Sequence, residues 1–544
     1  MRSGYGTTGR RILAGVLGAA ALLLLAVPAT AQHRARLSQD LADQLKAPKG
    51  QTLQVIVDGD AALLRDLAAR YGLRVTRQLD AGLVLEGTAE GFDAAANDPA
   101  FTHGATDHTV QADMAVTRES TGALAVAAGF DTLPGFTGKG VRIAVIDSGI
   151  DITHPAVAGR VFLAKNFTGD AADAVVDGFG HGTHVADVIA GTPIKIPGQG
   201  SLGGMAPGAE LISLKVLAAD GSGKTSDVIR ALEWVLRNAK AYDIRIVNLS
   251  MGHPVFESYT DDPLCRAAQN LIDAGIVVVA SAGNNGKVTV DGQMIPVYGG
   301  INVPGNLPDI ITVGALNTFQ TANRGDDSVA TYSSKGPTAI DKVIKPDLVA
   351  PGNKVFAAMV AGSTVASTPG LETLKGVGGA RFIQMSGASV SAGVVSGAVA
   401  LMLEANPTLG PAHVKMALQL SASFLPEGQL VAGSGSLNAA GAVWMAVNGP
   451  SPKVPAVEIA GDEVVGSGVL YWTGKKSGLQ DIVQGDRIIW GDRIIWGDRI
   501  IWGDRIIWGD RIIWGDRIIW GDRIIWGDRI IWGDITLSGD YVTS

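Results

Sequence analysis

Short apolar runs bounded by glycines alternate with stretches of helical periodicity between about residues 130 and 448. The runs are apolar at nearly every position, which is typical of strands buried on both faces of a parallel sheet. Helical stretches at 225–240 and 263–274 separate them. The alternation predicts an α/β domain whose parallel sheet is covered by helices on both faces. The expected strands are residues 142–146, 210–216, 244–248, 276–280 and 310–314.

Polar residues stand where such a sheet would place an active site, at the carboxyl ends of strands. Asp147 directly follows the strand at 142–146, although a turn aspartate has the same pattern. His181 lies between two glycines and begins a helical stretch. His184, three residues later, suggests a metal site, but no Cys or carboxylate cluster accompanies the pair at ligand spacing. We therefore expect one histidine to be catalytic and the other to pack within the helix.

A serine and an asparagine complete the set of candidates. Ser389 precedes an apolar helical stretch, and the free N–H groups of a helix start suit a developing oxyanion. A helix cap is the alternative, and three other serines compete for the role: Ser386, Ser391 and Ser396. Asn284 follows the strand at 276–280 and could donate a hydrogen bond there, although Asn-Gly runs are more often turns.

The chain order Asp…His…Ser is one of the three orders that convergent catalytic triads use. An unrelated α/β hydrolase such as an esterase would need a Gly-x-Ser-x-Gly elbow after a strand and the order Ser…Asp…His. The segment around Ser389 and the chain order both oppose that alternative.

These motifs together resemble the catalytic domain of subtilisin-like serine proteases, the subtilases, over about residues 130–448. The resemblance rests on Val-Ile-Asp-Ser-Gly-Ile at 145–150, Gly-His-Gly-Thr-His-Val-Ala at 180–186, Ala-Gly-Asn at 282–284, Gly-Ala-Ser at 387–389 and Gly397. Supporting matches are Ser-Ser-Lys-Gly-Pro at 333–337, Lys-Pro-Asp-Leu-Val-Ala-Pro-Gly at 345–352 and Gly-Ser-Gly-Ser-Leu-Asn-Ala at 433–439.

The resemblance implies a serine endopeptidase that cuts polypeptides through an acyl-enzyme. Ser389 would be the nucleophile, His181 the general base and Asp147 the residue that orients the base. Asn284 and the backbone N–H of Ser389 would bind the oxyanion. Activity should rise as His181 loses its proton, near neutral pH.

The resemblance also implies a cleft that pairs its backbone with an extended peptide. Ser250, Met251 and Gly252 should form one wall. The other wall should be formed by Lys215, Val216 and Leu217, followed by residues 221–223, and Gly283 should also contact substrate.

Some residues depart from the family pattern. The nucleophile motif usually reads Gly-Thr-Ser-Met-Ala-x-Pro, and here Ala388, Val390, Ser391 and Gly393 differ from it. Gly393 places a flexible residue where proline would stiffen the helix start, so we expect a loosened support. Ala156 stands where the family often has a calcium-binding aspartate, so that site does not carry over. We expect no cofactor for the chemistry, and a structural calcium stays open.

The N-terminal part predicts two segments. Residues 1–31 read as a secretory signal peptide, with Arg10 and Arg11 before an apolar run and a small-x-small pattern at 29–31, and a retained membrane anchor is the alternative. Residues 33–115 show a β-α-β-β-α order that fits a small α+β, ferredoxin-like unit, with a last strand near 109–111. This unit resembles the inhibitor-type propeptide of subtilases, which implies self-inhibition until a cut between about Asp113 and Gly122. An independent binding domain is the alternative.

The C-terminal part predicts a linker at 449–484 and a tail at 485–532, which holds eight identical copies of Gly-Asp-Arg-Ile-Ile-Trp. Arg-Ile-Ile-Trp favours a strand and Gly-Asp a two-residue turn, so the tail is either a meander of short strands or a solenoid. Its apolar faces favour binding to a surface or self-association.

The whole-chain expectation is a secreted subtilisin-like α/β/α protease with a small α+β propeptide and a β-type repeat tail. A net charge of −8 without a basic stripe argues against nucleic acid as a partner. Cys265, the one cysteine, rules out an internal disulfide and should be a buried structural thiol. The competing function is an inactive protease fold that binds or adheres through its tail.

Overall fold

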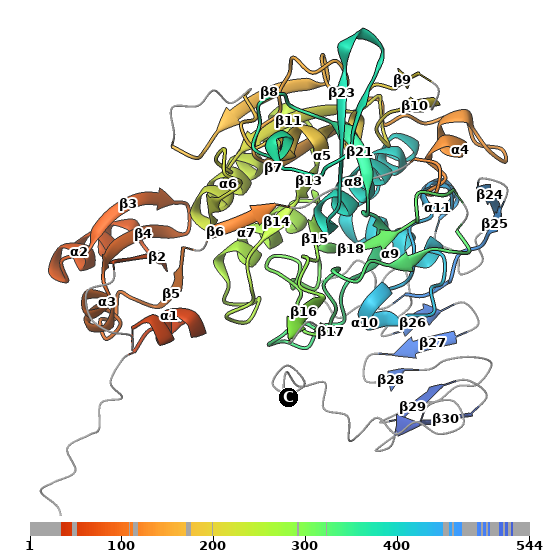
Figure 1. The fold of residues 1–544 in the computed structure, drawn as a ribbon. Helices are drawn as coiled ribbons and strands as arrows, with labels where there is room; N and C mark the ends of the chain where they lie inside the picture. The colour runs from red at the N-terminus through yellow and green to blue at the C-terminus, as the bar shows by residue number, and fades with distance from the viewer. Residues whose placement is uncertain are drawn as a thin grey trace, which may run out of the picture.

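The computed structural model describes residues 34–45, 52–107, 109–112, 118–169, 176–197, 200–290, 293–322, 324–449, 456–459 and 462–470, and short tail strands between 487 and 525. The predicted signal peptide at 1–31 and most of the predicted linker lie outside these residues. Figure 1 shows a large α/β body with a smaller N-terminal unit beside it.

An eight-stranded sheet forms the centre of the body. All of its pairings are parallel except that of β19 with β18. The five strands predicted from apolar runs are confirmed, with ends that differ by a few residues at most. In spatial order the strands are β8 (Val161–Asn166), β11 (Glu210–Lys215), β7 (Arg142–Asp147), β13 (Ile244–Leu249), β15 (Val277–Ser281) and β18 (Ile311–Asn317), which pairs with both β20 (Leu348–Pro351) and β19 (Ser328–Val329).

Helices cover both faces of this sheet. Successive residues of β7 alternate between two buried clusters: Ile143 and Val145 pack toward one face, Ala144 and Ile146 toward the other. The predicted three-layer α/β/α architecture is therefore confirmed. The first face carries α5 (His181–Ala190), α8 (Ala388–Ala405), α4 (Ala123–Ala128), α9 (Pro411–Ser421) and α11 (Ala439–Asn448), and the second carries α6 (Thr225–Tyr242) and α7 (Pro263–Asp273).

Helix α8 is a long and strongly apolar helix of the body. By length and composition it could cross a membrane, yet 89% of the window that passes this test is buried inside the protein. Burial on all sides explains its composition, because a helix that packs against neighbours all round needs no polar face.

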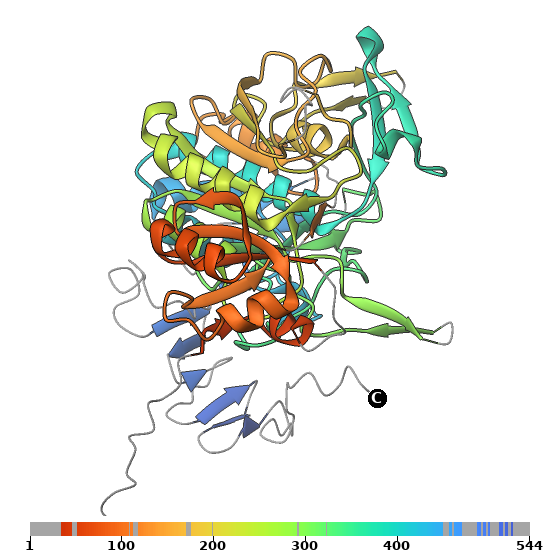
Figure 2. The ribbon, with the colours of Figure 1, turned by 90° about the vertical axis from the view of Figure 1, so that its left-hand side faces the viewer.

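The N-terminal unit is a sheet with two main helices on one side (Figure 2). Strand β4 lies between β2 and β3 and is antiparallel to both, which is the split βαβ arrangement. The elements are β1 (Arg36–Leu37), α1 (Gln39–Gln44), β2 (Thr52–Asp58), α2 (Ala61–Arg70), β3 (Arg74–Leu79), β4 (Gly82–Thr88), α3 (Ala89–Ala95) and β5 (His103–Thr106), in the sheet order β1-β5-β2-β4-β3.

The last strand of this sheet differs from the sequence prediction. We expected it near residues 109–111, but β5 ends at Thr106 and β6 (Thr109–Ala112) pairs with the large body instead. Asp107 explains the departure. Its two carboxylate oxygens accept hydrogen bonds from Ser226 N and Ser226 Oγ in the first turn of α6, at 2.9 and 2.6 Å. A carboxylate at a helix N-terminus is favourable, and it directs the chain off the sheet.

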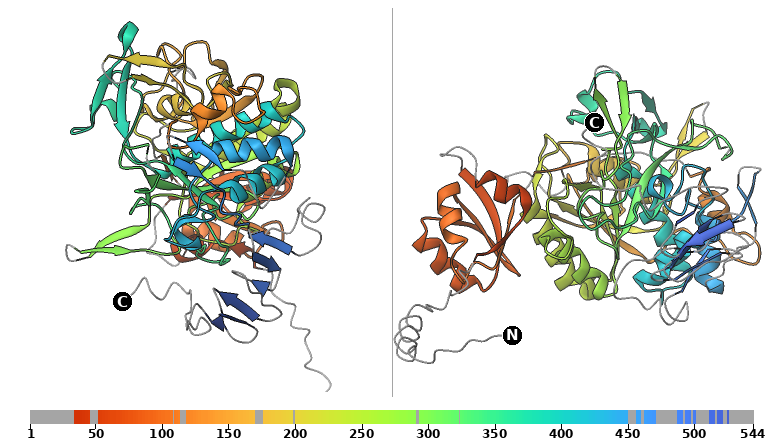
Figure 3. Two further views of the ribbon diagram at one scale, coloured as in Figure 1. Left: turned by 90° about the vertical axis from the view of Figure 1, so that its right-hand side faces the viewer. Right: turned by 90° about the horizontal axis from the view of Figure 1, so that it is seen from below.

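The open face of the N-terminal sheet packs on α6 and α7 (Figure 3, right). Ile56, Leu79 and Val84 join the same buried cluster as those helices. Ion pairs surround the apolar contact, among them Arg77 with Asp227 and Arg266 with Asp58. A cavity of about 420 Å³ remains between the two parts.

Smaller elements decorate the body and the tail. In the body these are β9 (Ile194–Ile196), β10 (Gly200–Leu202), β12 (Gly223–Lys224), β14 (Met251–Gly252), β16 (Lys287–Val290), β17 (Gln293–Pro296), β21 (Val355–Ala358), β22 (Thr373–Lys375), β23 (Arg381–Met385), α10 (Gln429–Ala432), β24 (Val457–Ile459), β25 (Asp462–Val464) and the short 3-10 turns Val365–Ser367 and Val377–Gly379. The tail strands are β26 (Arg487–Trp490), β27 (Arg493–Trp496), β28 (Arg499–Ile500), β29 (Arg511–Trp514), β30 (Arg517–Trp520) and β31 (Ile524–Ile525). Strands β26, β27 and β28 pair antiparallel in chain order, as in a meander.

Candidate active site

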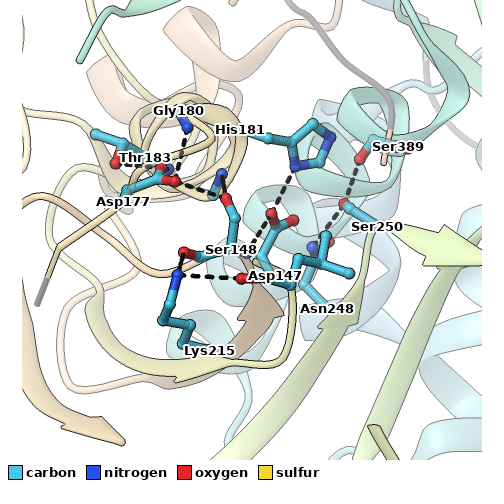
Figure 4. Close-up of polar contacts among 12 residues, drawn as sticks. Asp147, Ser148, Asp177, Gly180, His181, Thr183, Lys215, Asn248, Ser250 and Ser389 are labelled. Atoms are coloured by element: carbon cyan, nitrogen blue, oxygen red, sulfur yellow. Dashed lines mark hydrogen bonds and ion pairs between the residues drawn. The ribbon is translucent and has the colours of Figure 1, made fainter. Parts of the chain in front are cut away.

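Asp147 and His181 meet at the carboxyl edge of the central sheet (Figure 4). Asp147 is the last residue of β7, and His181 is the first of α5. His181 Nδ1 lies 2.6 Å from Asp147 Oδ1, and both side chains are buried. Asp147 Oδ1 also accepts a hydrogen bond from Ser148 N at 2.7 Å. A buried carboxylate at this distance fixes the orientation of the imidazole ring.

Two glycines make this approach possible. Gly180, which caps α5, has a φ of +95°, a conformation that L side chains rarely adopt. At Gly182 a Cβ atom would lie 2.1 Å from Gly149 O and 3.1 Å from Asp147 Cβ. The glycines on both sides of His181 therefore let helix α5 start against the loop that follows Asp147.

Ser389 lies in the first turn of α8 and is fully buried. In the view of Figure 4 the His181 ring lies between the Asp147 carboxylate and Ser389. Among the described residues, Ser389 Oγ has no hydrogen-bond partner. Such contacts in a resting site are often long and tighten only with substrate.

The competing serines are engaged elsewhere. Ser386 Oγ accepts a hydrogen bond from Lys354 N, and Ser391 Oγ lies 3.4 Å from Pro351 O. Ser396 Oγ donates to Asn248 Oδ1 at 2.9 Å. Of the four candidates, Ser389 is thus the one whose hydroxyl has no such partner.

A polar chain that the sequence did not suggest holds the turn of Ser389 in place. Asn248 Nδ2 donates to Ser250 Oγ at 2.8 Å, and Ser250 Oγ donates to Ser389 O at 2.6 Å. The signal for this role was present in the sequence, since Asn248 and Ser250 are polar residues at the carboxyl end of an apolar strand.

Asn284 reaches the same turn from β15. Its Oδ1 accepts a hydrogen bond from Ala388 N at 3.0 Å. The amide oxygen is thereby committed to the residue before Ser389, and Nδ2 remains as the donor end of the side chain. Gly283, beside it, has a φ of +101°, and its carbonyl accepts from Ser334 N.

Two strands from the expected cleft walls form a three-stranded antiparallel sheet, and its middle strand comes from the segment that follows the N-terminal unit. Strand β6 lies between β12 and β14, with Val110 opposite Gly223 and Gln111 opposite Gly252. Leu217 bridges to Gly223 and so continues the β12 side. The backbone of residues 109–112 therefore occupies the place expected for an extended peptide.

His184 is the histidine of the pair that packs within the body. It is fully buried, its Nε2 lies 3.2 Å from Ile383 O, and burial with the neighbouring His181 lowers its pKa to about 3. In the part of the chain that the structure describes, no group of three or more His, Cys, Asp or Glu side chains is arranged to hold a metal ion. Cys265 is buried, as expected of a structural thiol, and burial raises its pKa.

Gly393 has a packing role that the sequence did not reveal. It is buried where α8 crosses α5, and a Cβ atom there would lie 3.2 Å from Val188 Cγ1. The glycine thus allows the helices that carry Ser389 and His181 to approach closely. The interpretation of Gly393 as a loosened support did not include this contact.

Two further charged residues near the site have contacts that the sequence did not reveal. Asp177, four residues before His181, is buried and bonds to the segments that carry Asp147 and His181. Lys215, the last residue of β11, donates from Nζ to Ser148 O at 2.8 Å and to Leu217 O at 3.0 Å. The sequence held a signal for both residues, because each is a charged residue within or beside an otherwise apolar segment near a motif.

Comparison with known proteins gives a consistent family. A family model described as "Subtilase family" (Peptidase_S8) matches residues 138–443. Serine protease AprX of Bacillus subtilis (strain 168) is 36% identical over 313 residues, which are 56% of this chain and 67% of that protein. Subtilisin Savinase of Lederbergia lenta is 33% identical over 308 residues, 56% of this chain and 91% of that protein.

Other matches are partial. Subtilisin E of Bacillus subtilis (strain 168) is 32% identical over 291 residues, and this chain spans 62% of its length. The crystal structure of fervidolysin from Fervidobacterium pennivorans, a keratinolytic enzyme related to subtilisin, superposes with a TM-score of 0.57 at 20% identity, covering 78% of this chain and 64% of that one. At this identity the likeness establishes the fold, which is subtilisin-like.

Proposed function

Because the chain belongs to the subtilase family of serine peptidases, we propose that it is an exported endopeptidase that is made as a self-processed zymogen. The catalytic residues are Asp147, His181 and Ser389. The observation that carries the proposal is the buried 2.6 Å contact between Asp147 Oδ1 and His181 Nδ1, next to a serine with a free hydroxyl.

Ser389 Oγ attacks the carbonyl carbon of the scissile peptide bond while His181 Nε2 takes its proton. The tetrahedral intermediate collapses to an ester on Ser389 as His181 returns the proton to the leaving amine. Water then enters, loses a proton to His181 and releases the acid from Ser389. Asp147 holds the ring in the tautomer with a proton on Nδ1 and stabilises the imidazolium that forms twice in the cycle.

The oxyanion forms beside the first turn of α8. The backbone N–H of Ser389 is an unsatisfied donor of a helix start, and Asn284 Nδ2 is the second donor. The hydrogen bond from Ala388 N to Asn284 Oδ1 at 3.0 Å supports this role, because it turns the NH2 group away from the helix backbone.

The substrate is a polypeptide bound as an extended strand. Residues 109–112 pair with β12 and β14 through main-chain hydrogen bonds, and a substrate would use the same two edges. This self-occupancy supports the zymogen role of the N-terminal unit. We place the processing cut after Ala112, which lies on the cleft, and before Arg118, since Ser120 and Thr121 already bond to the catalytic body.

Every group that the reaction needs comes from the chain itself, so we propose that it requires no cofactor. The signal at 1–31 would direct export, and the neutral, partly apolar tail would bind a surface or self-associate. Sedimentation of the full chain against one that ends at Gly449 tests the tail: equal behaviour in solution and on cell-wall or polymer surfaces would exclude both roles.

The central test compares the wild-type chain with Ser389→Ala. The wild type should lose its N-terminal unit and react with a serine-directed phosphonate, and the variant should do neither. A variant that matures and labels like the wild type would refute the nucleophile. A wild-type chain that never labels, in an intact fold, would favour the non-enzymatic adhesion protein.

A further inference from the structure

Asp177 is a carboxylate that the mechanism above does not use, and in Figure 4 Ser148 lies between it and Asp147. Its side chain is 1% exposed. Four donors surround it. Oδ1 accepts from Ser148 Oγ and Gly180 N, both at 2.7 Å, and Oδ2 accepts from Thr183 Oγ1 and Thr183 N at 2.7 and 2.8 Å.

The two hydroxyl groups act as donors toward Asp177. Each also accepts a hydrogen bond from a backbone N–H: Ser148 Oγ from Gly182 N and Thr183 Oγ1 from Asp151 N, both at 2.9 Å. Each hydroxyl thus uses its one hydrogen on Asp177 and one of its two acceptor positions on the backbone. All four contacts are donations to the carboxylate, which uses its acceptor positions in full and suits the ionised form.

These contacts join the two segments that carry Asp147 and His181. Ser148 follows Asp147, and its backbone N–H donates to Asp147 Oδ1. Gly180 and Thr183 flank His181 in the cap and first turn of α5. One carboxylate thus connects the end of β7 to the start of α5, the two elements whose relative position sets the distance from Asp147 to His181.

The described titratable groups beside Asp177 and His181 include Asp147, Lys215 and His184, which interacts electrostatically with His181. Burial raises the pKa of Asp177, and the four donors oppose that effect. Asp147 is the second carboxylate nearby, and the Lys215 ammonium, bonded to Ser148 O, offsets part of their negative charge. A negative charge bonded to the residues that flank His181 favours the imidazolium that forms during catalysis.

We propose that Asp177 is a positioning residue of the peptidase reaction, which holds the loop after Asp147 and the first turn of α5 together so that His181 faces Ser389. The inference rests on the proposed function of those three residues. It adds a fourth side chain, which fixes the relative position of Asp147 and His181 and contributes a negative charge, without contact with substrate.

Asp177→Asn is the direct test. Asparagine replaces one acceptor oxygen with an NH2 group, which faces two donors in either orientation. We expect kcat per phosphonate-titrated active site to fall about 10- to 100-fold with KM within about twofold, since a small misplacement of catalytic groups has effects of this size. The acid limb of the pH profile of kcat/KM should move to lower pH, because a negative charge that favours imidazolium is lost.

A second buried carboxylate, within helix α5 itself, provides the control. Asp187 is equally buried in α5, but it accepts from Ala358 N at 2.7 Å, away from the triad. Asp187→Asn should change thermal stability and leave kcat per active site and the acid limb as in the wild type. If both variants lose kcat and shift the acid limb equally, the effect belongs to α5 packing and the proposal is overturned.

Thr183 gives a second test that does not depend on the folding of Asp177→Asn. Thr183→Val removes one donor at constant shape and should lower kcat about 3- to 10-fold, whereas Thr183→Ser keeps the hydroxyl and should stay within about twofold of the wild type. Equal kcat values for the two variants would overturn the proposal. A wild-type chain that neither labels nor cleaves would instead refute the proposed function, so the two failures are distinguishable.

Discussion

His103 of the N-terminal unit lies with Nε2 2.5 Å from Oε2 of Glu257, a residue of the catalytic body. Its Nδ1 lies 2.9 Å from Asp58 Oδ2, and the ring is 2% exposed. With a carboxylate on each nitrogen, both must donate, so the ring is cationic. Burial lowers the pKa of His103, but the two carboxylates outweigh it and raise the pKa to about 9.

The first prediction is that alkaline pH releases the cleaved N-terminal unit. Asp58 stays with His103 after release, and Glu257 does not, so binding raises the pKa of His103. The contribution of Glu257 is complete below the pKa that His103 has in the released unit, and it is lost as pH rises through about 9. We expect affinity to fall about tenfold between pH 7 and 10.5, measured by size-exclusion chromatography of the nicked complex.

Glu257→Gln is the control for this prediction. It keeps an acceptor but removes the charge, so release should begin at lower pH than in the wild type. Retention of the unit that does not change from pH 7 to 10.5 would contradict the role of His103.

The second prediction concerns the oxyanion donor. Asn284→Ala should lower kcat about 10²- to 10³-fold with little change in KM, a magnitude adopted from the loss of one such donor in subtilisin itself. Asn285→Ala is the matched control, because Asn285 Nδ2 bonds to Asn302 Oδ1 and Gly300 O instead. Comparable losses in the two variants would remove Asn284 from the site.

The third prediction uses the close approach at Gly182. Gly182→Ala would place Cβ 2.1 Å from Gly149 O, so α5 must move away from the Asp147 loop. We expect a loss of kcat of about 100-fold or more and a lower Tm. Gly410→Ala, where the nearest atom would be His413 Nδ1 at 4.0 Å, should leave kcat intact. Unchanged activity in Gly182→Ala would show that the start of α5 is not tightly held.

The fourth prediction concerns stability. The half-buried Arg324 donates to Ser120 O, Ser436 Oγ and Leu437 O, which ties the start of the catalytic body to the segment before its last helix. In the Ser389→Ala background, which prevents self-digestion, Arg324→Met should lower the free energy of unfolding by about 2–3 kcal/mol. Denaturant midpoints measure this, with the exposed Arg381→Met as the control. Equal midpoints would mean that water replaces these bonds without cost.

The sequence predicted the central strands because each is an apolar run, as expected of a strand that is buried on both faces of the sheet. It missed β8 (Val161–Asn166), an edge strand whose apolar run is only four residues long and whose side chains are half-buried or exposed. It placed residues 109–111 in a strand but with the wrong partner. Periodicity reports the conformation of a segment, while the partner depends on Asp107 and Ser226, which are more than a hundred residues apart.

The candidate triad was accessible because three short motifs stand at strand ends and helix starts. Its supports were not, because Asp177 and Lys215 are single charged residues whose meaning depends on the segments that surround them in space. The packing role of Gly393 required the same information, since the contact with Val188 joins two helices that are distant in the chain.

Strand β6 occupies the cleft as part of the same covalent chain. A tethered segment is held at an effective concentration that is on the order of millimolar for short links and does not change on dilution. Free peptides at micromolar concentration would therefore not displace β6 from a newly folded molecule. The lag before activity should depend on the intramolecular cut and on the departure of the cut unit. A higher protein concentration should therefore not change the time at which the first active molecules appear. It should shorten only the later phase, in which those molecules cut their neighbours.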